Sequence, residues 1–363
     1  MKRIEVLVSL LVLFSASVPL MVRAESFNIV SSELTDAAGF EISWNQKLPL
    51  HRNEKPKEVY YLGGRLYILT TNNFLFSLNG STGKIVFNRS LAVSGLPIMG
   101  LDLYGDRLYS VSGSRLMQLD ADLGTTERIN NLDVRVVSSP VRNKDFFYFA
   151  GVDKRVAAVR ADDRVQMFEV AAENDSAIAA LSATEDYFVF GTVRGNVVVG
   201  APDEPVKLWQ FDAAEAVVGD ITAVGDRLFF ASKDTNVYSL DVEKKKLRWK
   251  YQCSAVLEDG PQVTADMVYQ CVPGSGLIAL NADDGELLWK VEGGESLLCS
   301  DDGVSYVMTA NGRLMVMDDR RQRKAFAVNF SSVDSYVANT LDSKMFILND
   351  KGYINCIIPL NND

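Results

Sequence analysis

The sequence predicts an all-β protein that folds as an eight-bladed β-propeller of four-stranded antiparallel blades. A short apolar segment of the type YSLD or IALN recurs about every forty residues, and an aromatic residue follows most of these segments at a fixed distance. Around these segments lie short strand-like stretches rich in Val, Leu, Phe and Tyr, separated by Gly and Asp turns. Four such strands in about forty residues make one propeller blade.

The forty-residue period is regular along the chain. Successive apolar segments end 41, 40, 41, 40, 40, 37 and 40 residues apart. The residues that end them are Asn79, Asp120, Arg160, Ala201, Asp241, Asn281, Asp318 and Ile358. The residues eight positions further on are Phe87, Arg128, Phe168, Trp209, Trp249, Trp289 and Phe326. We expect the three tryptophans of this second set to fill the space between adjacent blades, because large aromatic side chains dominate core burial.

The two ends of the chain together supply one blade. The eighth apolar segment has no aromatic residue after it, because the chain ends at Asp363. The stretch from Phe40 to Leu48 contains Trp44, resembles the strands around Trp249 and Trp289, and precedes the first repeat. We therefore expect this N-terminal strand to close the last blade, so that residues 40–363 form one propeller without a free sheet edge. An open solenoid is the alternative, and the split last unit disfavours it.

The N-terminus predicts an export signal in residues 1–24. Lys2 and Arg3 give a basic start, residues 6–14 are apolar except for one serine, Pro19 interrupts the run, and Ala24 is a small residue suited to cleavage. An uncleaved anchor helix is the alternative. Residues 25–39 are then a loosely held N-terminal lead. No cysteine follows the apolar run, so the sequence does not predict a lipoprotein, and no later segment reaches the roughly 20 apolar residues of a transmembrane helix.

The charge balance argues against nucleic acid as a partner. The chain has 37 Lys and Arg residues against 47 Asp and Glu residues, which gives a formal net charge of −10. Removal of residues 1–24 takes away three basic residues and one acidic residue, so the exported chain carries −12. A chain this acidic repels the phosphate backbone, and we expect a monomeric exported protein without a transmembrane segment.

The sequence offers no catalytic or metal-binding constellation. His51 is the single histidine, which excludes a His-His zinc site, and no G-x-S-x-G motif supports a serine triad. We expect His51 on the surface of a connection. The acidic turns Asp283–Gly285 and Asp301–Gly303 lack the alternating ligand spacing of a calcium loop and are expected to be solvated. We therefore predict no catalytic residue, no metal and no cofactor.

Candidate binding residues lie in the predicted turns between the second and third strands of the blades. Most of these turns hold a cation in an otherwise acidic chain, which predicts a positively charged rim around the central opening for an acidic peptide, glycan or partner loop. Ordinary solvated hairpin turns are the alternative. The basic runs at residues 243–246 and 319–324 belong to the opposite face and are expected to be solvated. The candidate residues are Arg115, Arg155, Arg194, Lys233, Arg313 and Lys351.

The four cysteines leave two interpretations open. Cys253 follows the outer strand of one predicted blade, and Cys271 closes the second strand of the next, so both are placed near the same face. A Cys253–Cys271 disulfide is a hypothesis that fits an oxidising compartment. The alternative is four buried thiols that act as small apolar residues.

Three segments resemble the pyrroloquinoline-quinone (PQQ) type repeat, a strand that ends in Ala-Leu-Asp, a Thr-Gly-Lys turn and a tryptophan. They are NFLFSLNGSTGKIVF at residues 73–87, NVYSLDVEKKKLRW at residues 236–249 and GLIALNADDGELLW at residues 276–289. The resemblance covers nearly the whole exported chain and implies one of two branches. Quinoprotein dehydrogenases use the quinone with calcium, whereas the BamB family of outer-membrane assembly factors is a scaffold without chemistry.

Two features separate these branches. The dehydrogenases typically carry an adjacent Cys-Cys pair and cofactor-enclosing insertions, whereas this chain is all blades and its cysteines stand apart at positions 253, 271, 299 and 356. The resemblance therefore implies an exported, non-enzymatic scaffold for a protein partner in the cell envelope, similar to BamB and placed in the periplasm or outside the cell. It departs from that family in lacking the lipid-acceptor cysteine. A small PQQ-dependent or other redox enzyme is the alternative.

Overall fold

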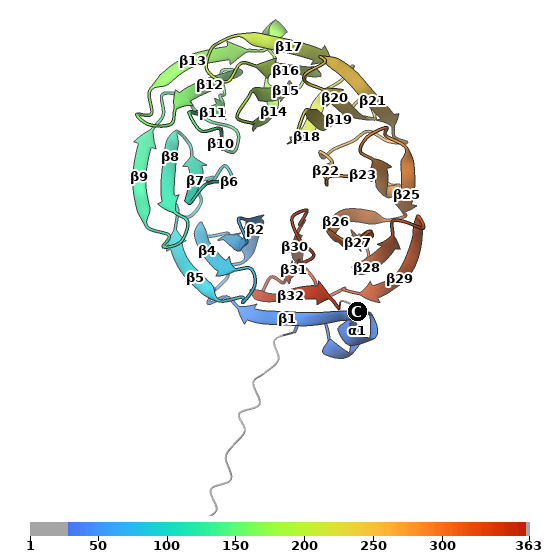
Figure 1. Cartoon of the computed structure of the whole chain (residues 1–363). Coiled ribbons are helices and arrows are strands. Elements are labelled where there is room, and N and C mark those ends of the chain that lie inside the picture. The colour runs from blue at the N-terminus through green and yellow to red at the C-terminus, as the bar shows by residue number, and fades with distance from the viewer. Residues whose placement is uncertain (1–27, 361–363) are drawn as a thin grey trace, which may run out of the picture.

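The computed structural model describes residues 28–360 and shows a ring of eight four-stranded antiparallel sheets (Figure 1). Within each of the first seven sheets the strands follow the order of the sequence, and the first strand lies nearest the centre of the ring. The predicted fold class, the number of blades and the number of strands in each blade are therefore confirmed.

The strands of the first four blades are given from the inner to the outer edge. Blade one contains β2 (Pro56–Leu62), β3 (Arg65–Thr70), β4 (Phe74–Asn79) and β5 (Ile85–Ser90). Blade two contains β6 (Leu101–Tyr104), β7 (Arg107–Ser112), β8 (Arg115–Asp120) and β9 (Thr126–Asn131). Blade three contains β10 (Val141–Arg142), β11 (Phe146–Ala150), β12 (Arg155–Arg160) and β13 (Gln166–Ala171). Blade four contains β14 (Ile178–Ala183), β15 (Phe188–Thr192), β16 (Asn196–Gly200) and β17 (Lys207–Asp212).

The remaining four blades complete the ring. Blade five contains β18 (Val217–Val224), β19 (Arg227–Ser232), β20 (Asn236–Asp241) and β21 (Lys246–Gln252). Blade six contains β22 (Gln262–Val263), β23 (Met267–Val272), β24 (Gly276–Asn281) and β25 (Leu287–Val291). Blade seven contains β26 (Gly294–Asp301), β27 (Val304–Thr309), β28 (Arg313–Asp318) and β29 (Arg323–Asn329). Blade eight contains β30 (Ser335–Val337), β31 (Met345–Leu348), β32 (Tyr353–Pro359) and, outermost, β1 (Phe40–Lys47).

The core lies between neighbouring blades, on both sides of the middle strands. In blade one the second strand, β3, is buried at five consecutive residues, whereas the outer strand, β5, alternates between half-buried and exposed residues. This difference arises because a middle strand is covered by the adjacent blade on each face, while an outer strand faces solvent on one side. The middle strands therefore form the buried core of the ring, and the turns between strands form its two faces.

The ring has two faces, which we name by their connections. The connection face carries the turns between second and third strands, such as residues 151–154, together with the links between successive blades. The hairpin face carries the turns between first and second strands, such as residues 105–106, and between third and fourth strands. Main-chain bonds hold the two kinds of segment on the connection face together, for example from Val152 to the carbonyl of Arg135 (3.0 Å).

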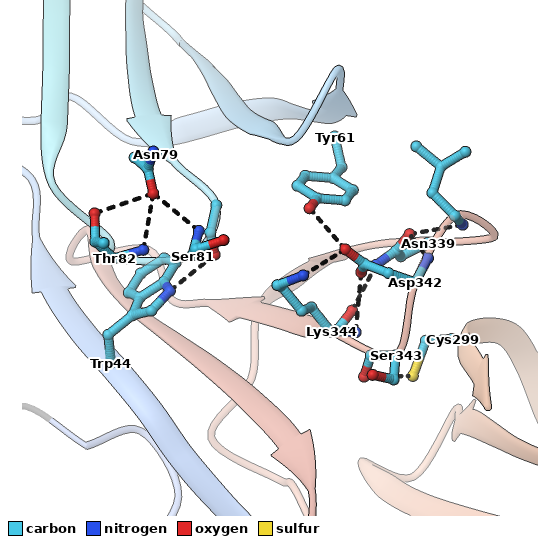
Figure 2. Close-up of polar contacts among 12 residues, drawn as sticks. Trp44, Tyr61, Asn79, Ser81, Thr82, Cys299, Asn339, Asp342, Ser343 and Lys344 are labelled. Carbon is cyan, nitrogen blue, oxygen red and sulfur yellow. Dashed lines mark hydrogen bonds and ion pairs between the residues drawn. The ribbon is translucent and has the colours of Figure 1, made fainter. Parts of the chain in front are cut away.

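The N-terminal strand closes the last blade, as expected. Strand β1 pairs antiparallel with β32, from Phe40 opposite Pro359 to Lys47 opposite Tyr353. The indole N–H of Trp44 donates to the carbonyl of Gly80 in blade one at 2.9 Å (Figure 2). The seam of the ring is the pairing of β1 with β32. Hydrogen bonds and packing hold these two strands together, because they lie at opposite ends of the chain.

The loop between β30 and β31 ties blade eight to both neighbours. The hydroxyl of Tyr61 in blade one donates to Asp342 at 2.9 Å, and the thiol of Cys299 in blade seven donates to the carbonyl of Ser343 at 3.3 Å (Figure 2). The main-chain N–H of Asn339 also donates to Leu298 of blade seven at 2.8 Å. The seam of the ring therefore has polar anchors in addition to its apolar core.

The described part of the N-terminal lead, residues 28–39, is packed rather than loosely held. Helix α1 (Ser32–Ala37) begins at Ser31, whose hydroxyl accepts from the N–H of Leu34. Val30 is buried in a cluster with Phe40, and the N–H of Ile29 donates to the buried Asn355 at 2.7 Å. The expectation failed because the lead buries apolar side chains that no periodic pattern revealed. The predicted export signal, residues 1–24, lies outside the described residues.

The recurrent tryptophans pack between blades. Trp249 is buried, and its indole N–H donates to the carbonyl of Ala282 in blade six at 3.0 Å, while Trp289 donates to Asp319 in blade seven at 2.8 Å. Trp209 is only half-buried. The predicted role of Trp249 and Trp289 between blades is confirmed, and Trp209 contributes less.

Candidate binding surfaces

The six predicted cations all lie exposed on the connection face. Arg155 forms an ion pair with Glu169 at 2.8 Å, so its charge is compensated within blade three. The other five form no ion pair with any residue between 28 and 360. They are Arg115, Arg194, Lys233, Arg313 and Lys351.

The cations stand over the middle of the blades. Each one lies in the turn between the second and third strands or begins the third strand, whereas the first strand of each blade lies closest to the centre (Figure 1). The structure thus brings the cations onto one face but distributes them over separate blades. A partner would meet them across the face of the ring.

Exposed aliphatic side chains share the connection face with these cations. Their exposed fractions range from 46% to 76%. They belong to the links between blades and to two of the turns between second and third strands. They are Val93, Leu96, Val137, Val152, Val193 and Val256.

Sequence reasoning missed this aliphatic set. A signal was present, since Val152 and Val193 stand inside hairpin turns where Gly, Asn and Asp are usual. Exposure could not be predicted for the aliphatic residues of the links between blades, because apolar residues in these links are buried at some positions and exposed at others. Leu132 and Val134 in the link after blade two are buried, for example.

Cationic and aliphatic residues occur together on the connection face of blades two to five, and we call this region the mixed surface. Val137 and Val152 lie beside each other, since Val137 donates to Ala150 and Val152 donates to Arg135. Exposed apolar groups among arginines are typical of protein-binding surfaces. The mixed surface consists of Arg115, Val137, Val152, Val193, Arg194 and Lys233.

The basic runs on the hairpin face behave as solvated turns. Lys244 pairs with Asp241 at 3.2 Å, Arg321 pairs with Asp318 at 3.3 Å, and Arg320 pairs with Asp302. In each pair, an acidic residue of the same blade compensates the charge of the Lys or Arg side chain. That these runs are solvated turns rather than a docking site stays a prediction.

The single histidine lies where the sequence places it. His51 is exposed in the link between blades eight and one, its main-chain N–H donates to Glu54 at 2.8 Å, and its ring lies 5.6 Å from that of Phe74. In the described part of the chain, no group of three or more His, Cys, Asp or Glu residues is arranged to hold a metal ion. Among these same residues, no helix is long and apolar enough to cross a membrane.

All four cysteines are free thiols, so the hypothesised Cys253–Cys271 disulfide is not formed. Cys253 is buried in the core between blades five and six, and the thiol of Cys271 points to the carbonyl of Gly294 at 3.9 Å instead. Burial raises the pKa of Cys253 and of Cys356 to about 12 and that of Cys299 well above its ordinary value. These thiols stay protonated and are therefore poor nucleophiles.

The fold and the repeats make the chain similar to the PQQ-type β-propellers of the BamB-like kind. A family model described as outer membrane protein assembly factor BamB matches residues 194–332. The crystal structure of BamB from Moraxella catarrhalis is similar, with a TM-score of 0.69 at 13% identity, over 89% of this chain and 99% of that one. A comparison with curated proteins gave no match.

A designed protein resembles the chain almost as closely. The computationally designed Ika8 protein has a TM-score of 0.67 at 12% identity, over 86% of this chain and 98% of that one. Structural likeness at such identities is evidence for the fold alone. Function has to be argued from this chain's own surfaces.

Proposed function

We propose that this protein is an exported, non-enzymatic scaffold that holds a protein partner in the cell envelope, in the manner of a BamB-like assembly factor. The observation that carries the proposal is the mixed surface, where uncompensated cations stand among exposed valines. Such a surface suits a partner segment with acidic and apolar side chains, because the cations orient the approach and the valines are buried on contact.

The build of the ring supports a scaffold role. The middle strands are buried on both faces, and the seam is held by polar anchors, so a partner meets a pre-formed surface. A pre-formed surface avoids the entropy cost of ordering a loop on binding. The proposal includes a monomeric propeller, since one ring already presents the complete mixed surface.

The test is site-specific photo-crosslinking in the native envelope. A photoreactive residue at Val152 should capture a partner, whereas one at Leu123, which is also exposed but lies on the hairpin face, should not. The variant that combines Val152→Asp with Arg194→Glu should lose the complex. The matched control combines Leu123→Asp with Arg320→Glu, again one aliphatic residue and one arginine, and should keep it. Crosslinks only from the hairpin face would overturn the proposal.

The alternative, a small quinone-dependent or other redox enzyme, draws its support from the repeat type that the two branches share. The adjacent cysteines of those enzymes have no counterpart here, and the four thiols are separate. A titration with the quinone and calcium, followed by absorbance and by thermal unfolding, distinguishes the two functions. A tight stoichiometric complex would favour the enzyme.

A further inference from the structure

Four arginines line one cavity of about 370 Å³ on the hairpin face, at the junction between blades two and three. Arg107 and Arg128 belong to blade two, and Arg142 and Arg164 belong to blade three. The side chains of Tyr104 and Gln118 also line this cavity. Such a concentration of positive charge is unexpected in a chain with a net charge of −10.

Two of the arginines occupy positions where some other junctions have an aromatic residue and a glycine. At three junctions an aromatic residue of one blade covers a glycine of the next: Trp44 covers Gly83, Phe87 covers Gly124 and Trp249 covers Gly285. At the junction of blades two and three, the same two positions of the repeat hold Arg128 and Arg164. Arg164 keeps the left-handed backbone of the glycine that it replaces, with φ at +68°.

Three of the four arginines have no carboxylate partner in the part of the chain that the structure describes. Arg107 is compensated, since it pairs with Asp106 and with Glu127. Arg128 donates to the main-chain carbonyls of Asp162 and Asp163. Neutral carbonyl groups position a guanidinium but do not cancel its charge.

Arg142 and Arg164 are also held by neutral groups. Arg142 donates to the hydroxyl of Tyr109 and to the carbonyls of Asn143 and Lys144, each at 2.8 Å. Arg164 donates to the carbonyl of Ala161 and to the amide oxygen of Gln118, while its buried Nε–H has no acceptor. A buried N–H without an acceptor is costly, so a ligand oxygen that reached it would be stabilised.

Aromatic rings fix the orientation of these two guanidinium groups. Arg142 lies 4.1 Å from the ring centre of Tyr104, and both Arg142 and Arg164 lie 4.6 Å from that of Phe147. Stacking holds each guanidinium in place and leaves its edge N–H groups directed sideways. Burial, followed by the charges of Arg128 and Arg142, lowers the pKa of Arg164. Among residues 28–360, no carboxylate forms an ion pair with this guanidinium.

The carboxylates nearby are already engaged or lie outside the wall. Asp106, which lines the cavity, pairs with Arg107, and the side chain of Asp162 is exposed at the cavity edge. Asp102 and Glu185 act on Arg142 from a distance, and Glu185 accepts from Tyr104 and from the N–H of Lys144. None of them forms an ion pair with Arg128, Arg142 or Arg164 within the described residues.

We propose that this cavity binds an oxyanion, the phosphate or carboxylate group of a small ligand, between Arg128, Arg142 and Arg164. The planar guanidinium forks match the oxygens of either group, and the ligand supplies the counter-charge that the protein lacks. The cavity lies on the hairpin face, opposite the mixed surface. Anion binding can therefore be tested independently of the proposed scaffold function.

Calorimetric titration of the full-length exported protein tests the proposal, with inorganic phosphate in one arm and succinate in the other. Both titrations are run against sodium chloride at matched ionic strength, which removes general screening. Saturable binding of phosphate alone, of succinate alone or of both supports the site and identifies its anion. No saturable binding of either anion by the wild-type protein would overturn it.

The variant that combines Arg128→Phe with Arg164→Gly rebuilds the ordinary junction and is the sharpest test. It should fold, with a melting temperature at or above that of the wild type, and bind the anion at least about tenfold more weakly, because two charge-assisted contacts are lost. Arg164→Gly alone serves if the double variant fails to fold. The control that combines Arg115→Gln with Arg194→Gln should keep wild-type affinity. Unchanged affinity in the rebuilt junction would refute the site.

Discussion

Two junctions of the ring use the same positions of the repeat for opposite chemistry. Between blades five and six, the indole of Trp249 covers Gly285 and donates to Ala282 at 3.0 Å. Between blades two and three, Arg128 faces Arg164 across an open cavity. In the first junction an aromatic ring fills the space, and in the second arginine side chains line a cavity.

The difference shows that the repeat determines which positions of two blades meet, whereas the residue types at these positions can differ between junctions. The aromatic junction stabilises the ring through burial. The arginine junction places a non-glycine residue at φ +68° and leaves three guanidinium groups uncompensated, which reduces stability. Local features that cost stability in this way concentrate at functional sites.

The largest expected effect is at the aromatic junction. Trp249→Ala should lower the free energy of unfolding by about 3 to 5 kcal/mol, because it leaves a cavity against blade six. Trp209→Ala is the matched comparison and should lower it less, since Trp209 is only half-buried. Chemical denaturation measures both. Equal losses would show that the closed contact with a glycine is not the source of stability.

The second largest effect is expected from substitution of Gly285, the glycine that Trp249 covers in the same junction. A Cβ at Gly285 would lie 2.6 Å from Cδ2 of Trp249, at φ +76°. Gly285→Ala should therefore lower the free energy of unfolding by about 2 to 3 kcal/mol, through strain and overpacking together. Gly225→Ala isolates the backbone strain, because Gly225 has φ +61° but open space around it. Thermal unfolding that ranks the two variants equally would argue against the clash.

The arginine junction has a neighbour whose charge depends on pH. Burial raises the pKa of Asp102 to about 6, while the N–H of Leu103 and the charge of Arg142 act in the opposite direction. The folded protein thus takes up a proton at higher pH than the unfolded chain, so this residue adds stability as pH falls from 7 towards 4. Asp102→Asn should raise the free energy of unfolding at pH 7 by up to about 2 kcal/mol.

The pH dependence of the stability difference tests whether the Asp102 carboxylate is desolvated in the folded protein. Urea denaturation between pH 4 and 8 should show the gain of the Asn variant shrinking as pH falls, until it disappears near the unfolded-state pKa of about 4. A gain that is constant over this range would mean that the carboxylate is not desolvated in the folded protein.

The smallest effect is expected from Arg164→Gly without ligand. Glycine adopts the left-handed backbone at no steric cost, so the free energy of unfolding should rise by about 0.5 to 1 kcal/mol despite the loss of stacking on Phe147. Differential scanning calorimetry at low phosphate measures it. A clear fall in stability would indicate that Arg164 is retained for packing.

The sequence predicts the ring well because a blade is a local unit. The spacing of Leu75, Leu116 and their equivalents specifies the strands, and Trp44 at the N-terminus reveals how the last blade is completed. The packing of Val30 against Phe40 could not be predicted, because the lead has no counterpart elsewhere in the chain.

The candidate site was less accessible from sequence. The cations of the second-to-third-strand turns are exposed on one face as predicted, yet the valines beside them were missed because exposure in a link depends on both adjacent blades. Arg128 stands out in the aligned repeats, but Arg142 lies in a first strand, where the equivalent residues, such as Tyr61 and Val263, follow no common pattern. Only the three-dimensional arrangement places Arg128, Arg142 and Arg164 around one cavity.

The seam between β1 and β32 also sets the order of events when the chain folds. Phe40 pairs with Pro359, so the first strand of the propeller stays without its partner until the last blade has been synthesised. Contacts of such long sequence separation form late and slowly, and the exposed strand is vulnerable to mispairing in the meantime. A ring closed in this way therefore completes its last blade only after the whole chain has been synthesised.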